Sequence, residues 1–261
     1  MRRTNSAEVS FETEQGDVPV RALRVLRSDL GVRVTSSTGS IDVELVEHLF
    51  AALGGLGIYE GITLSVIGPE VPLLDGCARR FAEALLTLAP PAGAPRLVVA
   101  RAGEVTLGDS KYRFSPDASV SLSVEVQFRG RPCERATWDG TPAAFLEDIA
   151  EARTFGFLSD AARLREQGRA LHVDPAAVMV LDEHGRVLPP AEPERPAELA
   201  RHKLLDLIGD AYLYGGPPVG HVQALRPGHG ATHRAFEEAL ARGILLRVPR
   251  PPRVFSDTLR A

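Results

Sequence analysis

The chain has 261 residues, of which 44% are hydrophobic and 25% are charged. These proportions are ordinary for a globular protein and exclude a disordered, collagen-like or coiled-coil chain. Lys and Arg together number 30 and Asp and Glu 34, which gives a formal net charge of −4. We therefore expect no nucleic-acid partner and no anionic membrane partner, because both favour a basic excess.

The cysteines and the apolar segments indicate the compartment. The two cysteines, Cys77 and Cys133, are too few for a disulfide framework. The N-terminal string Met-Arg-Arg-Thr-Asn-Ser leads into no apolar segment of the kind that signal peptides carry. No apolar run reaches the roughly 18 residues that a membrane-spanning helix needs. We expect a cytoplasmic protein without a transmembrane segment.

The first part of the chain combines predicted strands with two predicted helices. Alternation of apolar and charged residues, or short apolar runs, predicts strands over residues 18–26, 31–35 and 62–67. Helical apolar spacing predicts helices over residues 43–56 and 77–88. Gly57 ends the first helix, and Asp75 is the expected N-cap of the second.

A proline-rich stretch, residues 90–95, is the predicted linker, and the pattern restarts after it. Strands are predicted over residues 97–102, 112–114, 119–128, 136–138, 178–182, 186–188 and 221–225. Helices are predicted over residues 146–152, 159–167, 197–214 and 231–243. Each part thus mixes strands and helices. This predicts an α+β fold of two similar domains, residues 1–93 and 94–261.

One candidate site is a string of polar residues within the predicted helix 197–214. His202, Asp206 and Asp210 are spaced by four residues, so they share one helical face. An imidazole and a carboxylate at this spacing can chelate one metal ion, although such a pair taken alone is more often an ordinary surface pair. Lys203 is one of only two lysines beside 28 arginines, so it is less expected as surface filler.

Glu47 and His48 are adjacent in the predicted helix 43–56. A metal-dependent hydrolase needs a metal ligand and, close to it, a carboxylate that takes a proton from water. The alternative is that Glu47 interacts with the helix dipole and that His48 is an ordinary core residue.

Two further segments could contribute to a site. His229 lies in a glycine-flanked turn between a predicted strand and a predicted helix, where catalytic groups are often found. The alternative is a solvent-exposed loop histidine. Thr154, Phe155 and Phe157 could line a pocket with a hydroxyl and two rings, or could belong to the core.

Five strings occur in one order along the chain and together carry a family resemblance. They are residues 46–57 (Val-Glu-His-Leu-Phe-Ala-Ala-Leu-Gly-Gly-Leu-Gly), 69–76 (Pro-Glu-Val-Pro-Leu-Leu-Asp-Gly), 152–157 (Ala-Arg-Thr-Phe-Gly-Phe), 202–210 (His-Lys-Leu-Leu-Asp-Leu-Ile-Gly-Asp) and 228–229 (Gly-His). From about residue 18 to about residue 242, the chain resembles the UDP-3-O-acyl-N-acetylglucosamine deacetylases, the LpxC family. These are zinc enzymes of lipid A synthesis that remove the N-acetyl group from an acylated UDP-sugar.

The resemblance implies a fold and a set of partners. The fold is α+β, with two similar two-layer domains whose helices pack face to face and with the active site at the domain junction. The implied cofactor is one Zn²⁺ ion, and the implied partner is a small molecule, the acylated UDP-amino sugar. We expect a monomer.

The resemblance also implies a role for each matching residue. The implied zinc ligands are His48, His202 and Asp206. The implied catalytic residues are the general base Glu47, the acid His229, its partner Asp210 and the oxyanion-binding Thr154. The implied substrate-binding residues are Lys203, Phe155 and Phe157, and an insert around residues 157–188 lines the acyl-chain passage.

Some family features are missing or altered. The family's opening strand and its Gly-Leu-His-Ser-Gly-like loop have no counterpart, which suggests a short or N-terminally truncated member. His172-Val-Asp174 stands where the family has a Gly-Gly-Ser turn. Two alternatives therefore remain beside the deacetylase. The chain could be a zinc amidohydrolase for a different N-acyl sugar nucleotide, or a non-catalytic zinc-containing protein that binds a sugar nucleotide.

Overall fold

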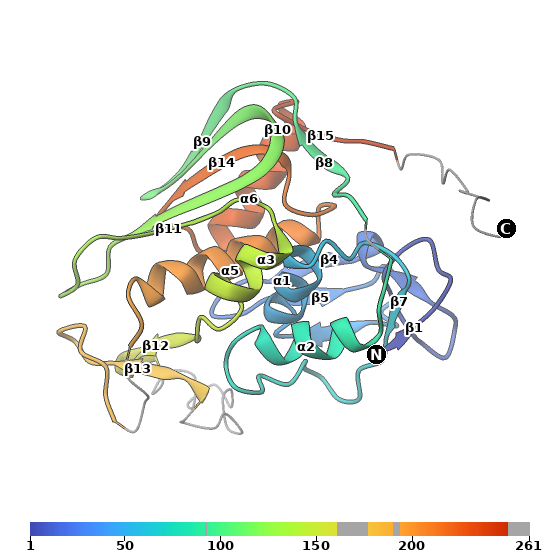
Figure 1. The fold of residues 1–261 in the computed structure, drawn as a ribbon, viewed down its shortest axis with the longest axis horizontal. Coiled ribbons are helices and arrows are strands. Elements are labelled where there is room, and N and C mark those ends of the chain that lie inside the picture. Colours follow the sequence, from blue (N-terminus) through green and yellow to red (C-terminus); the bar gives the residue numbers. More distant parts are fainter. Residues whose placement is uncertain (92, 161–176, 190–193, 250–261) are drawn as a thin grey trace, which may run out of the picture.

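The structure is a computed structural model that describes residues 1–91, 93–160, 177–189 and 194–249. Helices and strands are mixed along the chain, which confirms the predicted α+β class (Figure 1). The helices are α1 (Glu47–Gly55), α2 (Arg79–Thr87), α3 (Pro142–Ala144), α5 (Glu198–Tyr212) and α6 (His229–Ala241), with a 3₁₀ turn η1 (Val20–Ala22) and a π-helical turn η2 (Phe145–Ile149).

The strands fall into two groups along the chain. The N-terminal group is β1 (Arg2–Arg3), β2 (Ser10–Phe11), β3 (Val18–Pro19), β4 (Arg24–Arg27), β5 (Arg33–Thr35), β6 (Asp42–Glu44) and β7 (Ile62–Leu64). The C-terminal group is β8 (Leu97–Val99), β9 (Gly103–Leu107), β10 (Ser110–Val126), β11 (Glu134–Trp138), β12 (Phe155–Phe157), β13 (Met179–Leu181), β14 (Val219–Leu225) and β15 (Leu245–Arg247).

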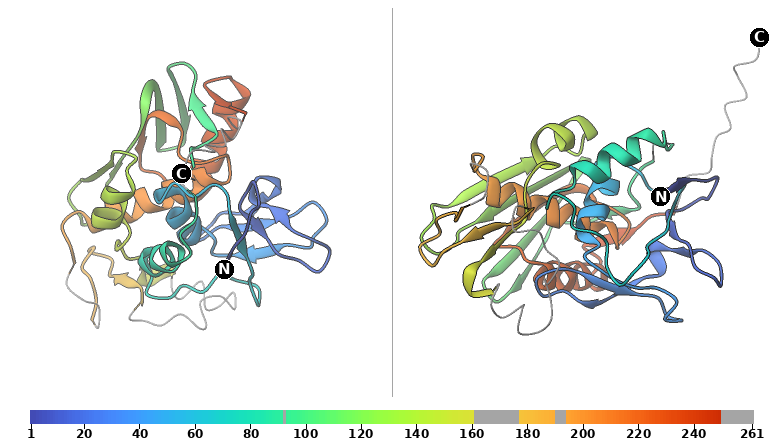
Figure 2. Two further views of the ribbon diagram at one scale, coloured as in Figure 1. Left: turned by 45° about the vertical axis from the view of Figure 1, so that its right-hand side comes forward. Right: turned by 90° about the horizontal axis from the view of Figure 1, so that it is seen from below.

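Strands of the two groups pair within their own group. The N-terminal strands form two small sheets, in the orders β1-β7-β2-β3 and β4-β5-β6. The C-terminal strands form a sheet in the order β11-β10-β14-β8-β15, with β9 paired to β10, and a separate parallel pair of β12 and β13. Figures 1 and 2 show the large sheet lying over α5 and α6, with the N-terminal strands beyond α1. The helices therefore lie between the sheets.

Helix α1 crosses α5 at very short range. Every residue of α1 is buried, which is typical of a helix that is apolar on all sides. A Cβ atom on Gly209 of α5 would overlap the carbonyl oxygen of Glu47, and one on Gly54 of α1 would lie 3.2 Å from the Ile208 side chain. The two glycines thus allow an approach of the backbones that larger residues would prevent. The crossing places the first turn of α1 against the middle of α5.

The structure corrects several predicted boundaries in the N-terminal part. Residues 42–44 form strand β6, so the prediction that the helix starts at residue 43 was wrong. Leu45 takes a φ of 59° and turns the chain from β6 toward α1. The prediction of Asp75 as an N-cap was also wrong, because Ala78 caps α2 and Asp75 accepts a hydrogen bond from the Cys77 thiol. The predicted strand 18–26 is interrupted by the turn η1.

The C-terminal part agrees better with its prediction. The predicted strands 112–114 and 119–128 are pieces of the single long strand β10, which shifts register between Ser115 and Val120. Strand β9 was not predicted. The predicted hairpin is confirmed by a bridge between Leu181 and Val187. Residues 161–167 of the predicted helix 159–167, and much of the insert around residues 157–188, lie outside the described residues.

Among the residues that the structure describes, no helix combines the length and the apolar character needed to cross a bilayer.

The glycine at the helix crossing gives a first testable prediction. Gly209→Ala is expected to lower the free energy of unfolding by about 1–3 kcal/mol, because the added methyl group forces α1 and α5 apart. Urea denaturation measures the change. Gly230→Ala is the matched control, since a Cβ atom there would make only an ordinary 3.4 Å contact with Ser28. Equal stability of the wild type and the Gly209→Ala variant would contradict the tight crossing.

Candidate metal and catalytic site

The first turn of α1 carries two buried polar side chains, Glu47 and His48. The backbone N–H of Val32 donates a hydrogen bond to Glu47 Oε2 at 3.0 Å and fixes the carboxylate. Burial raises the pKa of Glu47, and this effect outweighs the opposing influence of His229 and of the Val32 N–H. Glu47 is therefore a buried carboxylate with a raised pKa, adjacent to His48.

Helix α5 presents His202, Asp206 and Asp210 along one face, and all three are buried. His202 Nε2 lies 3.4 Å from Asp206 Oδ1, and His48 Nε2 lies 4.0 Å from the same oxygen. The His48 and His202 rings meet edge to face, with centroids 5.2 Å apart. The potential ligand atoms of the three residues all lie within 4.8 Å of one another, close enough to surround one metal ion.

The two histidines are held in the form that binds metals. His202 Nδ1 donates a hydrogen bond to the Ala152 carbonyl at 3.1 Å, which leaves the lone pair of Nε2 facing Asp206. Burial lowers the pKa of both imidazoles, that of His48 to about 3. Both rings are therefore neutral at pH 7, with Nε2 of each directed at one carboxylate oxygen.

Asp206 has one satisfied and one unsatisfied oxygen. Its Oδ2 accepts a hydrogen bond from Lys203 Nζ at 2.9 Å. Its Oδ1 is buried and has no hydrogen-bond partner among the described residues. Burial alone would raise the pKa of Asp206, but His202 and Lys203 outweigh it and hold this pKa well below its usual range. A buried, ionised oxygen that faces Nε2 of two neutral imidazoles, with the lone pair of His202 directed at it, is a poor arrangement without a cation, so these residues fit a metal ion.

His229, the first residue of α6, faces the same cluster. Its Nδ1 lies 3.0 Å from both carboxylate oxygens of Asp210, and its Nε2 lies 3.8 Å from Asp206 Oδ2. Burial disfavours the charged imidazole, but the carboxylates of Asp210 and Asp206 outweigh it and raise the pKa of His229 to about 9. Burial would raise the pKa of Asp210, but the facing His229 outweighs this effect and lowers the pKa to about 2. The pair is charged at neutral pH.

A buried ion pair fastens the segment that contains Thr154 to α5. The Arg153 guanidinium donates hydrogen bonds of 2.8 and 2.9 Å to the two oxygens of Glu198, whose side chain is fully buried at the start of α5. The Thr154 N–H donates to the Gly76 carbonyl at 2.7 Å, and the Met179 N–H donates to the Thr154 carbonyl at 2.9 Å. Thr154 is thus fixed through its backbone, two residues beyond the carbonyl that orients His202.

The two aromatic residues predicted to bind substrate differ in position. The Phe155 ring lies 5.7 Å from the His202 ring, and Lys203 Nζ lies 5.4 Å from the Phe155 centroid. Phe155 therefore joins the metal cluster. Both rings pack with Phe128 in a small core beside β13, Phe155 with its centroid at 5.1 Å and Phe157 at 5.8 Å. No described contact brings Phe157 to the three potential ligands.

One further histidine at this site was not predicted from the sequence. His233 lies one turn after His229 on α6, and its Nε2 is 3.4 Å from Asp210 Oδ1. The i, i+4 spacing of the two histidines was the signal that could have indicated it. The backbone contributions of Val32 and Ala152 carry no such signal, because they depend on folding alone.

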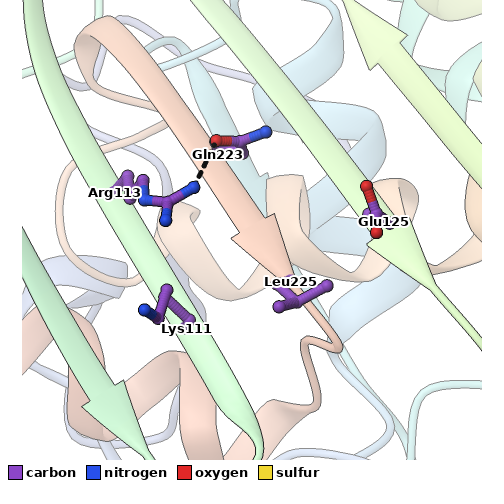
Figure 3. Close-up of a pocket in the computed structure, with 5 residues that line it drawn as sticks. All are labelled: Lys111, Arg113, Glu125, Gln223 and Leu225. Atoms are coloured by element: carbon purple, nitrogen blue, oxygen red, sulfur yellow. Dashed lines mark hydrogen bonds between the residues drawn. The ribbon is translucent and has the colours of Figure 1, made fainter.

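A separate cavity of about 110 Å³ lies on the outer face of the large sheet (Figure 3). It is lined by Lys111, Arg113, Glu125, Gln223 and Leu225. Lys111 and Arg113 alternate along β10 with buried residues that face the helices, so the cavity opens on the opposite side from the metal cluster. Both cations are paired with Glu104. Of the two lysines, Lys203 alone belongs to the candidate site.

Comparison with known proteins agrees with this geometry. A family model described as LpxC, UDP-3-O-acyl N-acetylglycosamine deacetylase, matches residues 5–241. The chain belongs to the LpxC family. A protein of Myxococcus xanthus (strain DK1622) named UDP-3-O-acyl-N-acetylglucosamine deacetylase is 34% identical over 86% of this chain and 72% of its own length.

Other members of the LpxC family are similar to the same extent. A protein of the same name from Phenylobacterium zucineum (strain HLK1) is 33% identical over 90% of this chain and 80% of its own length. Another from Shewanella sp. (strain ANA-3) is 32% identical over 86% of this chain and 74% of its own length.

Proposed function

We propose that the chain is a zinc-dependent deacetylase that hydrolyses the N-acetyl group of a UDP-3-O-acyl-N-acetylglucosamine in lipid A synthesis. The observation that carries the proposal is the buried cluster of two neutral imidazoles around an unpartnered carboxylate oxygen, next to a separate base and a separate charged acid. Membership of the LpxC family supplies the substrate class. A protein that only binds a sugar nucleotide would need neither Glu47 nor His229 in these positions.

His48, His202 and Asp206 are the residues that would hold the zinc ion. Two imidazole nitrogens and one carboxylate oxygen form a common ligand set for catalytic zinc, with a further position left for water or substrate. When bound, zinc supplies a Lewis acid for the amide carbonyl and lowers the pKa of water. The hydrogen bond from His202 to Ala152 supports this assignment, since ligating histidines typically donate their other N–H to a carbonyl or a carboxylate.

The other residues divide the proton transfers between them. Glu47 takes a proton from the attacking water while the water oxygen bonds to the acetamide carbon. The Thr154 hydroxyl and charged His229 stabilise the negative charge that develops on the carbonyl oxygen. His229 then donates its proton to the sugar nitrogen as the C–N bond breaks, which releases acetate and the free amine. Asp210 keeps His229 charged until that transfer.

We place the domain boundary at residue 93 and assign the acyl chain to the insert around residues 157–188. The separate pairing of strands up to β7 and from β8 onward supports the boundary. The position of the insert supports the assignment of the acyl chain, because β12 leads directly into the insert from Phe155, whose ring lies beside that of His202. Lys203 and Phe155 are the groups that would contact the substrate next to the zinc ion.

The function is tested by incubating the purified protein with UDP-3-O-acyl-N-acetylglucosamine and measuring acetate release. We expect activity that a chelator removes and that added Zn²⁺ restores. The same assay with short and long 3-O-acyl groups tests the insert, with the long chain expected to react faster. Activity only on another N-acyl sugar nucleotide would favour the paralogue, and no hydrolysis of any such substrate would refute the proposal.

Metal content gives a prediction for the ligand set. The wild type is expected to bind one zinc ion per chain, and His202→Ala to lose most of it, because one of three protein ligands is removed. Elemental analysis after dialysis measures the ratio. The control is His221→Ala, which removes a histidine of β14 that contacts Ser121 of β10. Full zinc retention in His202→Ala would exclude His202 from the ligand set.

The rate is expected to be bell-shaped in pH. Glu47 must be ionised, so the rate falls on the acid side, at a pH raised by the burial of Glu47. His229 must be protonated, so the rate falls as the pH rises through about 9. Asp210→Asn removes a carboxylate that raises the pKa of His229. The alkaline limb is therefore expected to move down by about 1–3 pH units.

Two further variants complete this measurement. His229→Ala should abolish the alkaline limb and lower the rate by about 10²- to 10⁴-fold. His221→Ala, on β14 and outside the proposed site, should leave the profile unchanged. If His229→Ala retained both the rate and the alkaline limb, another residue would be the acid.

A further inference from the structure

Two histidines of α6 face one buried carboxylate. His229 and His233 lie one turn apart, and both ring edges point at Asp210. The His233 side chain is only 4% exposed, and its Nε2 lies 3.4 Å from Asp210 Oδ1. This nitrogen is buried and has no aligned hydrogen-bond partner among the described residues. The mechanism above gives His233 no role.

Asp210 has more acceptor capacity than His229 can fill. A carboxylate offers about four acceptor sites, and a buried one that lacks donors is costly. Within the described ranges, the hydrogen bonds to Asp210 come from the single Nδ1 of His229, shared between its two oxygens. His233 Nε2 is the polar group placed to supply a second donor, because a small rotation of its ring would shorten the 3.4 Å separation to a hydrogen bond.

The Tyr214 hydroxyl lies within hydrogen-bond distance of the other ring nitrogen of His233, Nδ1. This hydroxyl lies 3.2 Å from His233 Nδ1, 3.3 Å from the His233 carbonyl and 3.5 Å from Glu237 Oε1. Burial raises the pKa of Tyr214 well above its usual value, so the hydroxyl keeps its proton and can donate. A bare Nε2 lone pair facing a buried carboxylate would be repulsive. The proton of the His233 ring therefore lies on Nε2, directed at Asp210.

We propose that His233 is a positioning residue for the acid His229. Its Nε2–H binds Asp210 Oδ1 and, together with Tyr214 behind it, holds the carboxylate with both oxygens toward His229 Nδ1. His233 touches neither the substrate nor the potential metal ligands, and it acts through Asp210. This inference rests on the proposed function, because it assigns His233 to the same proton transfer.

The test compares two amides of different reach. In His233→Gln the side-chain amide can reach the place of Nε2 and donate to Asp210, whereas in His233→Asn the shorter amide matches Nδ1 and faces Tyr214. We expect His233→Asn to lower kcat about 10- to 100-fold with little change in KM or zinc content, because a misplaced catalytic group mainly affects the chemical step. His233→Gln should retain kcat within about threefold of the wild type.

Thr232→Val is the control for stability alone. Thr232 lies on the same helix as His233, and its replacement removes a buried hydrogen bond with Tyr112 of β10. We expect this variant to destabilise the fold with little loss of kcat. Proton NMR of the His229 Nδ1–H, identified by its absence in His229→Ala, gives a readout without turnover. We expect this signal to be kept in His233→Gln and shifted or broadened by exchange in His233→Asn.

Two results would overturn the inference. Equal kcat values for the Asn and Gln variants would show that a donor to Asp210 is not what His233 provides. An unchanged His229 signal in His233→Asn would show that Asp210 is held without His233. A wild type that fails to deacetylate the substrate would refute the proposed function instead, and the NMR comparison would then decide the role of His233 alone.

Discussion

The crossing of α1 over α5 is the constraint on which the rest of the site depends. Gly209 has no side chain, so the carbonyl of Glu47 can lie directly against α5. This contact fixes the position of the first turn of α1 along α5, next to the polar residues His202, Asp206 and Asp210. His48 then meets His202 edge to face, and both imidazoles point at one oxygen of Asp206. A wider crossing would move His48 on α1 away from Asp206 on α5, and the potential ligand atoms would no longer surround one position.

The site concentrates ionisable groups that are buried together, so their charges must balance locally. Lys203 and His229 carry positive charge beside the carboxylates of Asp206 and Asp210, while His48 and His202 remain neutral. The protonation state of each imidazole is determined by the groups around it. His229 faces carboxylates and is charged, whereas His202 gives its one N–H to the Ala152 carbonyl. The same residue type is thus charged on α6 and a neutral potential ligand on α1 and α5, because different partners face each ring.

The sequence predicts the chemistry of this site better than its boundaries. The stripe on α5 follows from four-residue spacing alone, and the structure places His202, Asp206 and Asp210 on one buried face. The start of α1 was predicted too early because Val43 fits the apolar spacing of the helix that follows, while Leu45 has a left-handed φ that periodicity does not reveal. His233 was missed for a different reason, since the residue that it faces, Asp210, lies on another helix. Contacts between distant segments, such as Thr154 with Gly76, are likewise set by the tertiary fold.

The distribution of the potential ligands between α1 and α5 also links metal occupancy to stability. His48 comes from the N-terminal part of the chain, whereas His202 and Asp206 come from the C-terminal part. A cation held by all three joins segments that are far apart in sequence, as a covalent cross-link would, and it disfavours every unfolded conformation in which they separate. Any ion that binds this folded cluster in preference to the unfolded chain therefore raises the free energy of unfolding. By the same linkage, a substitution that loosens the packing of the two helices weakens the affinity for the ion without touching a ligand.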